Sequence, residues 1–302
     1  MSVVRIGTRG SALALAQTQT VANALTARGA TVEIVTVTTH GDTSTESLSE
    51  IGGTGVFASA LREALLASEC DVVVHSLKDL PTGPVDGLVI GAVPKRVDAR
   101  DALIARDALT LDTLPAGARV GTGSPRRAAQ LLSRRPDITV VDIRGNVDTR
   151  LGKVASGELD AVVLAAAGLE RLGRLEDATE LLSLDGWPTA PGQGALAIEV
   201  RQGDEKLVSS LNHAASRTVV EAERRTLGLL EAGCSAPVAA HALIEDGMLF
   251  LSARVYSADG SERITSSHAL YVSDTKDPAG ELAERVSKEL FDLGAAELMG
   301  AS

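Results

Sequence analysis

The sequence predicts two α/β lobes with mixed sheets, followed by a smaller α+β domain. Three observations carry this prediction. Strand and helix patterns alternate over the first two thirds of the 302 residues, two Pro-containing connectors at 94–101 and 187–194 interrupt the alternation, and the last part changes to neighbouring strands and one long helix. Alternating β and α units favour parallel or mixed sheets covered by helices.

The first lobe is expected to contain short apolar or β-branched strands, separated by helical patterns. Ser11 is a suitable N-cap for the first helix. The expected strands are 3–6, 32–38, 71–75 and 88–93, and the expected helices are 11–28 and 56–67.

The second lobe repeats the alternation after the first connector. One expected strand ends at 119–121, and two more span 138–142 and 160–164. The expected helices are 124–134, 146–156 and 165–172. After the Pro/Gly segment 187–194, residues 195–200 are predicted to return as a strand to the first lobe. A chain that crosses twice between two α/β lobes has the design of a hinged, two-lobed binding protein.

The C-terminal part is predicted to contain a helix at 221–230, two strands at 248–256 and 264–272 joined by the turn 258–260, and a closing helix at 279–293. The predicted boundaries are 1–96 with 193–214 for the first lobe, 97–192 for the second lobe and 215–302 for the α+β domain.

The composition excludes several classes of protein. The net charge is −11 and aromatic residues make up 2% of the chain, which argues against nucleic-acid binding. We expect no transmembrane span and no export signal, and therefore a cytoplasmic protein. The chain has two cysteines, which we expect to be free thiols, and its five histidines lack metal-site spacing, so no metal is predicted.

The segment 121–127, Gly-Thr-Gly-Ser-Pro-Arg-Arg, is the most informative local motif. It follows a strand and opens a helix, with Ser124 as the N-cap, so its free backbone N–H groups and its two arginines favour an anion. An ordinary capped helix with solvated arginines is the alternative. The motif lacks the third glycine of a dinucleotide fingerprint.

Further arginines follow other strands of the prediction. Arg144 and Arg150 lie after the strand at 138–142, Arg9 follows the first strand, and Arg171 lies near a helix end. Ligands of α/β sheets bind at strand ends, so a cationic cleft for a small polyanion is one interpretation. Salt bridges within the lobe explain Arg144 and Arg150 equally well.

Two other segments carry reactive groups. Lys78 and Asp79 follow the strand at 71–75; they form either a structural ion pair or, if Asp79 faces the cleft, a proton carrier and a stabiliser of cations. Cys70 is expected to be a packed thiol. Cys234 lies in a tight Gly-Cys-Ser-Ala-Pro loop, where a nucleophilic thiol could hold a group covalently.

Seven segments, in this order, resemble the porphobilinogen deaminase (hydroxymethylbilane synthase) family and span nearly the whole chain. They are Thr-Arg-Gly-Ser-Ala-Leu-Ala-Leu-Ala-Gln at 8–17, His-Ser-Leu-Lys-Asp-Leu-Pro at 75–81, the motif at 121–127, Ile-Arg-Gly-Asn-Val-Asp-Thr-Arg at 143–150, Ala-Ala-Ala-Gly-Leu-Glu-Arg at 165–171, Ala-Pro-Gly-Gln-Gly-Ala-Leu at 190–196 and the Cys234 loop.

The resemblance implies two lobes like those of periplasmic binding proteins and a third domain that carries a dipyrromethane cofactor, joined by a thioether to Cys234. It implies head-to-tail condensation of four porphobilinogen units, with loss of ammonia, and release of 1-hydroxymethylbilane by hydrolysis. It also implies a monomer.

The resemblance further implies the roles of the site residues. Asp79 matches the catalytic aspartate. The residues that match carboxylate-binding arginines and further polar contacts to cofactor and substrate are Arg9, Arg126, Arg127, Arg144, Arg150, Arg171, Ser11, Lys78, Thr122 and Ser124. Thr54 and Ser59 stand where many members carry basic residues, which leaves the contribution of that loop open.

Three alternatives predict different chemistry. A non-catalytic, two-lobed protein that binds small anions would carry no group on Cys234. A LysR-type regulatory domain would need a helix-turn-helix segment before the first strand, and the sequence shows none. A phosphate-handling transferase would leave Asp79 and Cys234 unexplained.

Overall fold

The computed structural model describes residues 3–37, 55–230 and 237–299. The chain forms two compact units, Met1–Val97 with Gly194–Arg217 and Asp98–Gln193 with Thr218–Ser302. The second unit therefore contains both the predicted second lobe and the C-terminal α+β part. The finer division into three domains stays a prediction.

The first unit is built on a five-stranded mixed sheet in the order β2-β1-β3-β10-β4. β1 pairs in parallel with β2 and β3, while β10 runs antiparallel to both β3 and β4, so the predicted return strand is confirmed. The strands are β1 (Val4–Thr8), β2 (Val32–Thr36), β3 (Val72–Ser76), β4 (Leu88–Ala92) and β10 (Leu196–Arg201), and the helices are α1 (Ala12–Thr26) and α3 (Gly55–Leu66).

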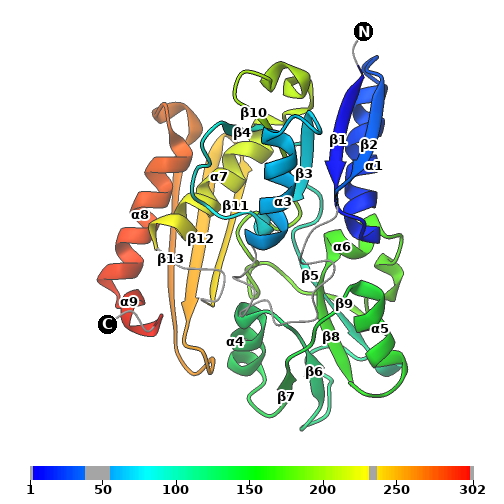
Figure 1. Ribbon diagram of the computed structural model, residues 1–302. Coiled ribbons are helices and arrows are strands. Elements are labelled where there is room, and N and C mark those ends of the chain that lie inside the picture. Colours follow the sequence, from blue (N-terminus) through cyan, green and yellow to red (C-terminus); the bar gives the residue numbers. More distant parts are fainter. Residues whose placement is uncertain (1–2, 38–54, 231–236, 300–302) are drawn as a thin grey trace. The chain divides into compact units, whose positions relative to one another are not determined.

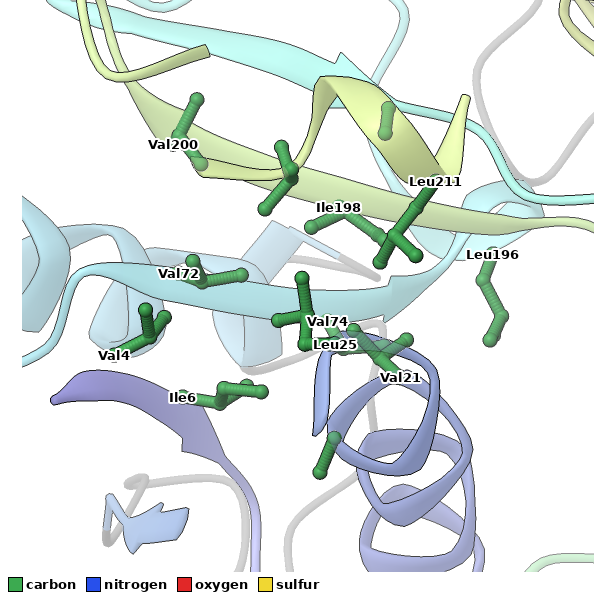
Figure 2. Close-up of a cluster of buried hydrophobic side chains, with 13 residues drawn as sticks. Val4, Ile6, Val21, Leu25, Val72, Val74, Leu196, Ile198, Val200 and Leu211 are labelled. Atoms are coloured by element: carbon green, nitrogen blue, oxygen red, sulfur yellow. The ribbon is translucent and has the colours of Figure 1, made fainter. Parts of the chain in front are cut away.

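The core of the first unit lies between α1 and one face of its sheet. Figure 2 shows Val21 and Leu25 of α1 beside Val74 of β3, with Ile6 from β1 and Ile198 from β10 in the same cluster. Each is at most 4% exposed. The return strand thus completes the core as well as the sheet.

The lobe of the second unit has a five-stranded mixed sheet in the order β7-β6-β8-β5-β9. β6 pairs in parallel with β7 and β8, and β5 is antiparallel to β8 and β9. The strands are β5 (Asp101–Ala105), β6 (Arg119–Gly121), β7 (Thr139–Val141), β8 (Ala161–Ala165) and β9 (Glu180–Leu181), and the helices are α4 (Pro125–Arg134), α5 (Val147–Ala155) and α6 (Ala166–Arg171). The sequence prediction missed β5 and β9.

The C-terminal part has an antiparallel sheet in the order β11-β12-β13, and α8 packs on β12 and β13 (Figure 1). The elements are α7 (Ala214–Leu229), β11 (Val238–Glu245), β12 (Met248–Tyr256), β13 (Arg263–Tyr271), α8 (Pro278–Asp292) and α9 (Ala295–Leu298). The prediction found β12, β13 and α8 but missed β11 and the first turns of α7. The mixed α/β sheets and the α+β tail are confirmed.

Short 3-10 turns connect several elements. They are η1 (Leu77–Asp79), η2 (Arg106–Ala108), η3 (Leu175–Asp177), η4 (Glu205–Leu207), η5 (Ser209–Leu211) and η6 (Val272–Asp274).

The hairpin between β12 and β13 docks on α4 of the same unit. Gly260 has a positive φ of 73°, and a Cβ atom there would lie 2.3 Å from the carbonyl oxygen of Ala129. Tyr256 is 1% exposed and forms a small core with Ala129 and Ala239. The α+β part is thereby packed against the helix that begins with Arg126 and Arg127.

Across the described residues, no helix combines the length and apolar character needed to cross a membrane. The same residues contain no group of three or more His, Cys, Asp or Glu side chains suited to a metal ion.

Candidate active site

The first unit brings Arg9, Ser11, Lys78 and Asp79 to one edge of its sheet. β1 and β3 are parallel neighbours, so the loop after β1 and the turn η1 after β3 both leave from the carboxyl ends of these strands. Ser11 caps α1, and its Oγ accepts a hydrogen bond from the Ala14 N–H at 3.3 Å. Asp79 is exposed, whereas the other three side chains are half-buried.

A buried ionic cluster lies in the same unit, next to η1. Glu199 of β10 is 3% exposed, and its carboxylate accepts three hydrogen bonds from Arg62 of α3 at 3.1, 3.0 and 2.9 Å. The Nε2 atom of His75, on β3, lies 3.3 Å from the same carboxylate. Burial alone would raise the pKa of Glu199, but His75 and Arg62 hold it below its ordinary value. No local sequence motif predicted this long-range pairing.

The second unit places its site residues after three neighbouring parallel strands. Thr122 and Ser124 follow β6, Arg144 and Arg150 follow β7, and Arg171 ends the helix after β8. Gly123 brings the first two loops into contact, because a Cβ atom there would lie 2.6 Å from the carbonyl oxygen of Ile143. The prediction that these groups gather at strand ends is consistent with this topology.

Two side-chain hydroxyl groups cap backbone N–H groups at the start of α4. Thr122 Oγ1 accepts a hydrogen bond from the Ser124 N–H at 3.2 Å, and Ser124 Oγ accepts one from the Arg127 N–H at 3.5 Å. Pro125 occupies the first turn, as predicted. Arg126 and Arg127 are 4% and 6% exposed, so the alternative of solvated arginines is wrong.

Arg150 has the carboxylate of Asp142 near enough to act on it electrostatically, but the two are not in ion-pair contact. The Nε of Arg150 donates to the carbonyl oxygen of Gly145 at 2.9 Å, and among the residues that the structure describes it forms no ion pair. Burial, and then the positive charge of Arg127, lower the pKa of Arg150 below its ordinary value. The salt-bridge alternative for Arg150 finds no support in the described part of the chain. Burial likewise lowers the pKa of Arg171, while Arg144 is exposed.

The remaining predicted features are the two cysteines and the loop positions Thr54 and Ser59. Cys70 is a buried free thiol, as predicted, and burial raises its pKa. Cys234 and Thr54 lie outside the described residues. Ser59 is exposed on α3.

Comparison with known families decides what this site serves. Residues 4–209 match the family model described as "Porphobilinogen deaminase, dipyromethane cofactor binding domain", and residues 218–292 match "Porphobilinogen deaminase, C-terminal domain". The chain belongs to the porphobilinogen deaminase family.

Curated porphobilinogen deaminases cover nearly the same length. The chain is 60% identical to the porphobilinogen deaminase of Leifsonia xyli, over 98% of this chain and 94% of that protein. It is 50% identical to the enzyme of Thermobifida fusca, over 98% and 95%. The chain is therefore a transferase of tetrapyrrole biosynthesis that condenses porphobilinogen and uses a dipyrromethane cofactor, and the non-catalytic alternative is not favoured.

Solved structures similar to this chain include the methionine-binding protein MetQ. That likeness has a TM-score of 0.45 and 12% sequence identity, and it covers 69% of this chain and 89% of MetQ. A periplasmic substrate-binding protein from Coxiella burnetii gives a TM-score of 0.44 at 16% identity, over 70% of this chain and 93% of that one.

Proposed function

We propose that the arginines at the strand ends of the second unit bind the carboxylates of cofactor and growing product, and that Asp79 of the first unit is the catalytic carboxylate. The observation that carries the first part is Arg150, which is half-buried, feels the positive charge of Arg127, and forms no ion pair among the described residues, although Asp142 acts on it at longer range. A desolvated guanidinium in that state favours a bidentate anion.

The substrate explains why so many arginines are needed. Each porphobilinogen brings an acetate and a propionate, so the number of carboxylates grows with every condensation. We assign Arg9, Arg144, Arg150 and Arg171 to substrate carboxylates. Arginine suits this task because its planar donors match a carboxylate and its charge persists at all physiological pH values.

The residues at the start of α4 fit the dipyrromethane cofactor. The Nε atom of Arg126 is buried and has no hydrogen-bond partner among the described residues, and the caps Thr122 and Ser124 add hydroxyl groups. We propose that these residues, with Arg127, Ser11 and Lys78, hold the cofactor's carboxylates and that Cys234 carries it as a thioether. When bound, the cofactor supplies the free pyrrole α-carbon to which the first substrate unit is joined.

Asp79 is suited to charge and proton handling. Departure of ammonia from porphobilinogen leaves a cationic azafulvene, the pyrrole α-carbon forms the new C–C bond, and that carbon then loses its proton. A carboxylate near the pyrrole N–H groups stabilises the cation and accepts or relays that proton. The exposed position of Asp79 at the end of η1 leaves its oxygens accessible to a ligand.

The catalytic proposal is tested with Asp79→Asn beside the control Asp86→Asn, an exposed aspartate before β4. We expect Asp79→Asn to lower kcat by about 10²–10⁴-fold without changing the melting temperature, since general acid–base groups contribute that much. The control should keep its turnover. Near-normal turnover of Asp79→Asn would remove Asp79 from the mechanism.

The carboxylate proposal is tested with Arg150→Leu beside Arg119→Leu, an exposed arginine at the opposite, amino end of β6. Loss of a charge-assisted hydrogen bond is worth about 1.5–3 kcal/mol, so KM should rise about tenfold or more in Arg150→Leu only. An unchanged KM in Arg150→Leu would show that Arg150 does not bind the substrate.

Cofactor attachment is tested by intact-protein mass spectrometry of Cys234→Ser and Cys70→Ser. We expect the mass of two linked pyrrole units on the wild type and on Cys70→Ser, and none on Cys234→Ser. A dipyrromethane adduct that persists in Cys234→Ser would contradict the assignment. We also propose that the protein is a cytoplasmic monomer. Light scattering of the holoenzyme tests the molecular mass, and cell fractionation tests the location.

A further inference from the structure

Asp101 is a buried carboxylate that neither the sequence motifs nor the proposed mechanism explain. It is the first residue of β5 and is 0% exposed. Although burial alone would raise the pKa of Asp101, Arg126 and Arg127 hold it far below its ordinary value. The group is therefore a buried anion, which is costly unless its partners are fixed.

Each oxygen of Asp101 serves one arginine. Oδ1 accepts hydrogen bonds from Nε and Nη2 of Arg127 at 3.1 and 2.7 Å. Oδ2 lies 2.9 Å from Nη1 of Arg126. Two adjacent guanidinium groups would otherwise repel each other in a desolvated site, so the carboxylate both separates them and fixes their orientations.

Two neutral donors complete the coordination of Asp101. Nε1 of Trp187 donates to Oδ2 at 2.8 Å, and Nε2 of Gln193 donates to Oδ1 at 2.8 Å. Trp187 is 1% exposed, and it is the one tryptophan in the sequence. The indole therefore touches the same oxygen as Arg126.

A second set of contacts links Arg126, through Gln130 of α4, to Tyr256 of the α+β part. Gln130 accepts a hydrogen bond from Arg126 Nη1 at 2.6 Å and donates from Nε2 to the Tyr256 hydroxyl at 3.4 Å and to the Pro188 carbonyl at 2.8 Å. Arg126 is thus held from both sides, while its Nε stays without a partner in the described structure.

We propose that Asp101 is the positioning residue for Arg126 and Arg127, and that it leaves this pair with one net positive charge for the carboxylates of the cofactor. The inference rests on the proposed role of the two arginines. Trp187 keeps Asp101 in place, so the indole senses the occupancy of the arginine pair through the shared Oδ2 atom.

The test compares the Asp101→Asn holoenzyme with Asp98→Asn, which breaks the partly exposed ion pair between Asp98 and Arg100 only three residues earlier. Asparagine keeps the shape of aspartate, but it has one acceptor oxygen and an NH₂ group that faces the second arginine. We expect KM to rise and kcat/KM to fall about tenfold or more in Asp101→Asn, together with a lower share of chains that carry the dipyrromethane mass. Asp98→Asn should behave as the wild type.

The fluorescence of Trp187 supplies a readout that should not respond to the substrate if Asp101 has a purely structural role. Addition of porphobilinogen to the wild-type holoenzyme is expected to change the tryptophan emission, and this change should be reduced in Asp101→Asn but kept in Asp98→Asn. A wild-type emission that porphobilinogen leaves unchanged would overturn the coupling to Trp187.

Two outcomes for Asp101→Asn would overturn the positioning role. Unchanged kinetic constants and cofactor load would leave Asp101 structural. A lowered KM would show that the carboxylate is only a counter-charge, since its loss then strengthens the attraction for the substrate.

If Asp101→Asn fails to fold, Trp187→Phe tests the positioning role instead, because it removes one hydrogen bond to Asp101 and keeps both ion pairs. We expect a KM about threefold to tenfold higher, in line with one lost hydrogen bond to a charged group; unchanged kinetics would refute the proposal. Arg126→Leu and Arg127→Leu test the underlying function separately. If both keep normal cofactor load and KM, the proposed function fails; if both are impaired while Asp101→Asn is normal, only this inference fails.

Discussion

Replacement of Arg62 by methionine should destabilise the first unit strongly. Glu199 is 3% exposed and the Arg62 side chain 13% exposed, and the three hydrogen bonds between them would all be lost. Of the partners that the described residues supply, the carboxylate would keep His75, at 3.3 Å. Removing one partner of a buried ion pair costs about 3–5 kcal/mol, so we expect a loss of that size in the free energy of unfolding at pH 7.

The loss should depend on pH in a definite direction. In the wild type the lowered pKa of Glu199 contributes stability above the pKa of the unfolded chain, and that contribution is lost as the pH falls through the folded value. In Arg62→Met we expect burial to outweigh the remaining contact with His75, so that the folded pKa of Glu199 rises above the unfolded value. The variant is therefore least stable relative to the wild type at pH 7 and recovers toward pH 5.

Urea unfolding followed by far-ultraviolet circular dichroism at pH 7 and pH 5 measures both effects. Arg28→Met, at the exposed end of α1, is the control and should stay within about 0.5 kcal/mol of the wild type. The double variant Arg62→Met with Glu199→Met should recover most of the loss, because apolar pairs often replace buried ion pairs without cost. A loss below about 1 kcal/mol in Arg62→Met, or one that does not change with pH, would refute the reasoning.

Three further predictions concern packing and caps. Gly260→Ala should lower the free energy of unfolding by more than about 2 kcal/mol, because its Cβ would clash with the Ala129 carbonyl. Gly247→Ala, with a similar positive φ and open space around it, should lower it by about 1 kcal/mol. Equal losses of stability in thermal unfolding would contradict the docking of the hairpin. Asn146→Ala removes the cap of α5 and should lower the unfolding free energy by about 1 kcal/mol in urea titrations, while Asn146→Asp, which keeps the acceptor, should not. Ile198→Ala in the core of β10 should cost about 2–5 kcal/mol in the same titrations, and a loss under 1 kcal/mol would mean that this core site collapses without a cavity.

The sequence predicted the elements whose signals are local. Ser11 and Ser124 cap helices as predicted, and the helix expected at 146–156 does begin after Asn146, which caps it. The gathering of arginines after β6, β7 and β8 also followed from the order of strands and loops, since parallel neighbours share one edge.

The elements that the sequence missed depend on distant partners. β5 begins with Asp101, a residue disfavoured in strands, and this start becomes possible because Arg126 and Arg127 neutralise the carboxylate. β11 carries three alanines with little β propensity, and its pairing with β12 decides its conformation. Glu199 and Asp101 were not predicted as site residues for the same reason, because a buried ion pair leaves no periodic pattern in the sequence.

The return of β10 has a consequence for how the chain folds during synthesis. β10 lies between β3 and β4, so the ribosome must add about a hundred residues after β4 before the strand that joins β3 to β4 exists. Until then β3 and β4 expose unpaired edges, which are prone to pair with other chains. The sheet from β5 to β9, by contrast, is encoded without interruption. We therefore expect the inserted lobe to fold first on the ribosome and the lobe that contains the N-terminus to follow it, against the usual order of synthesis.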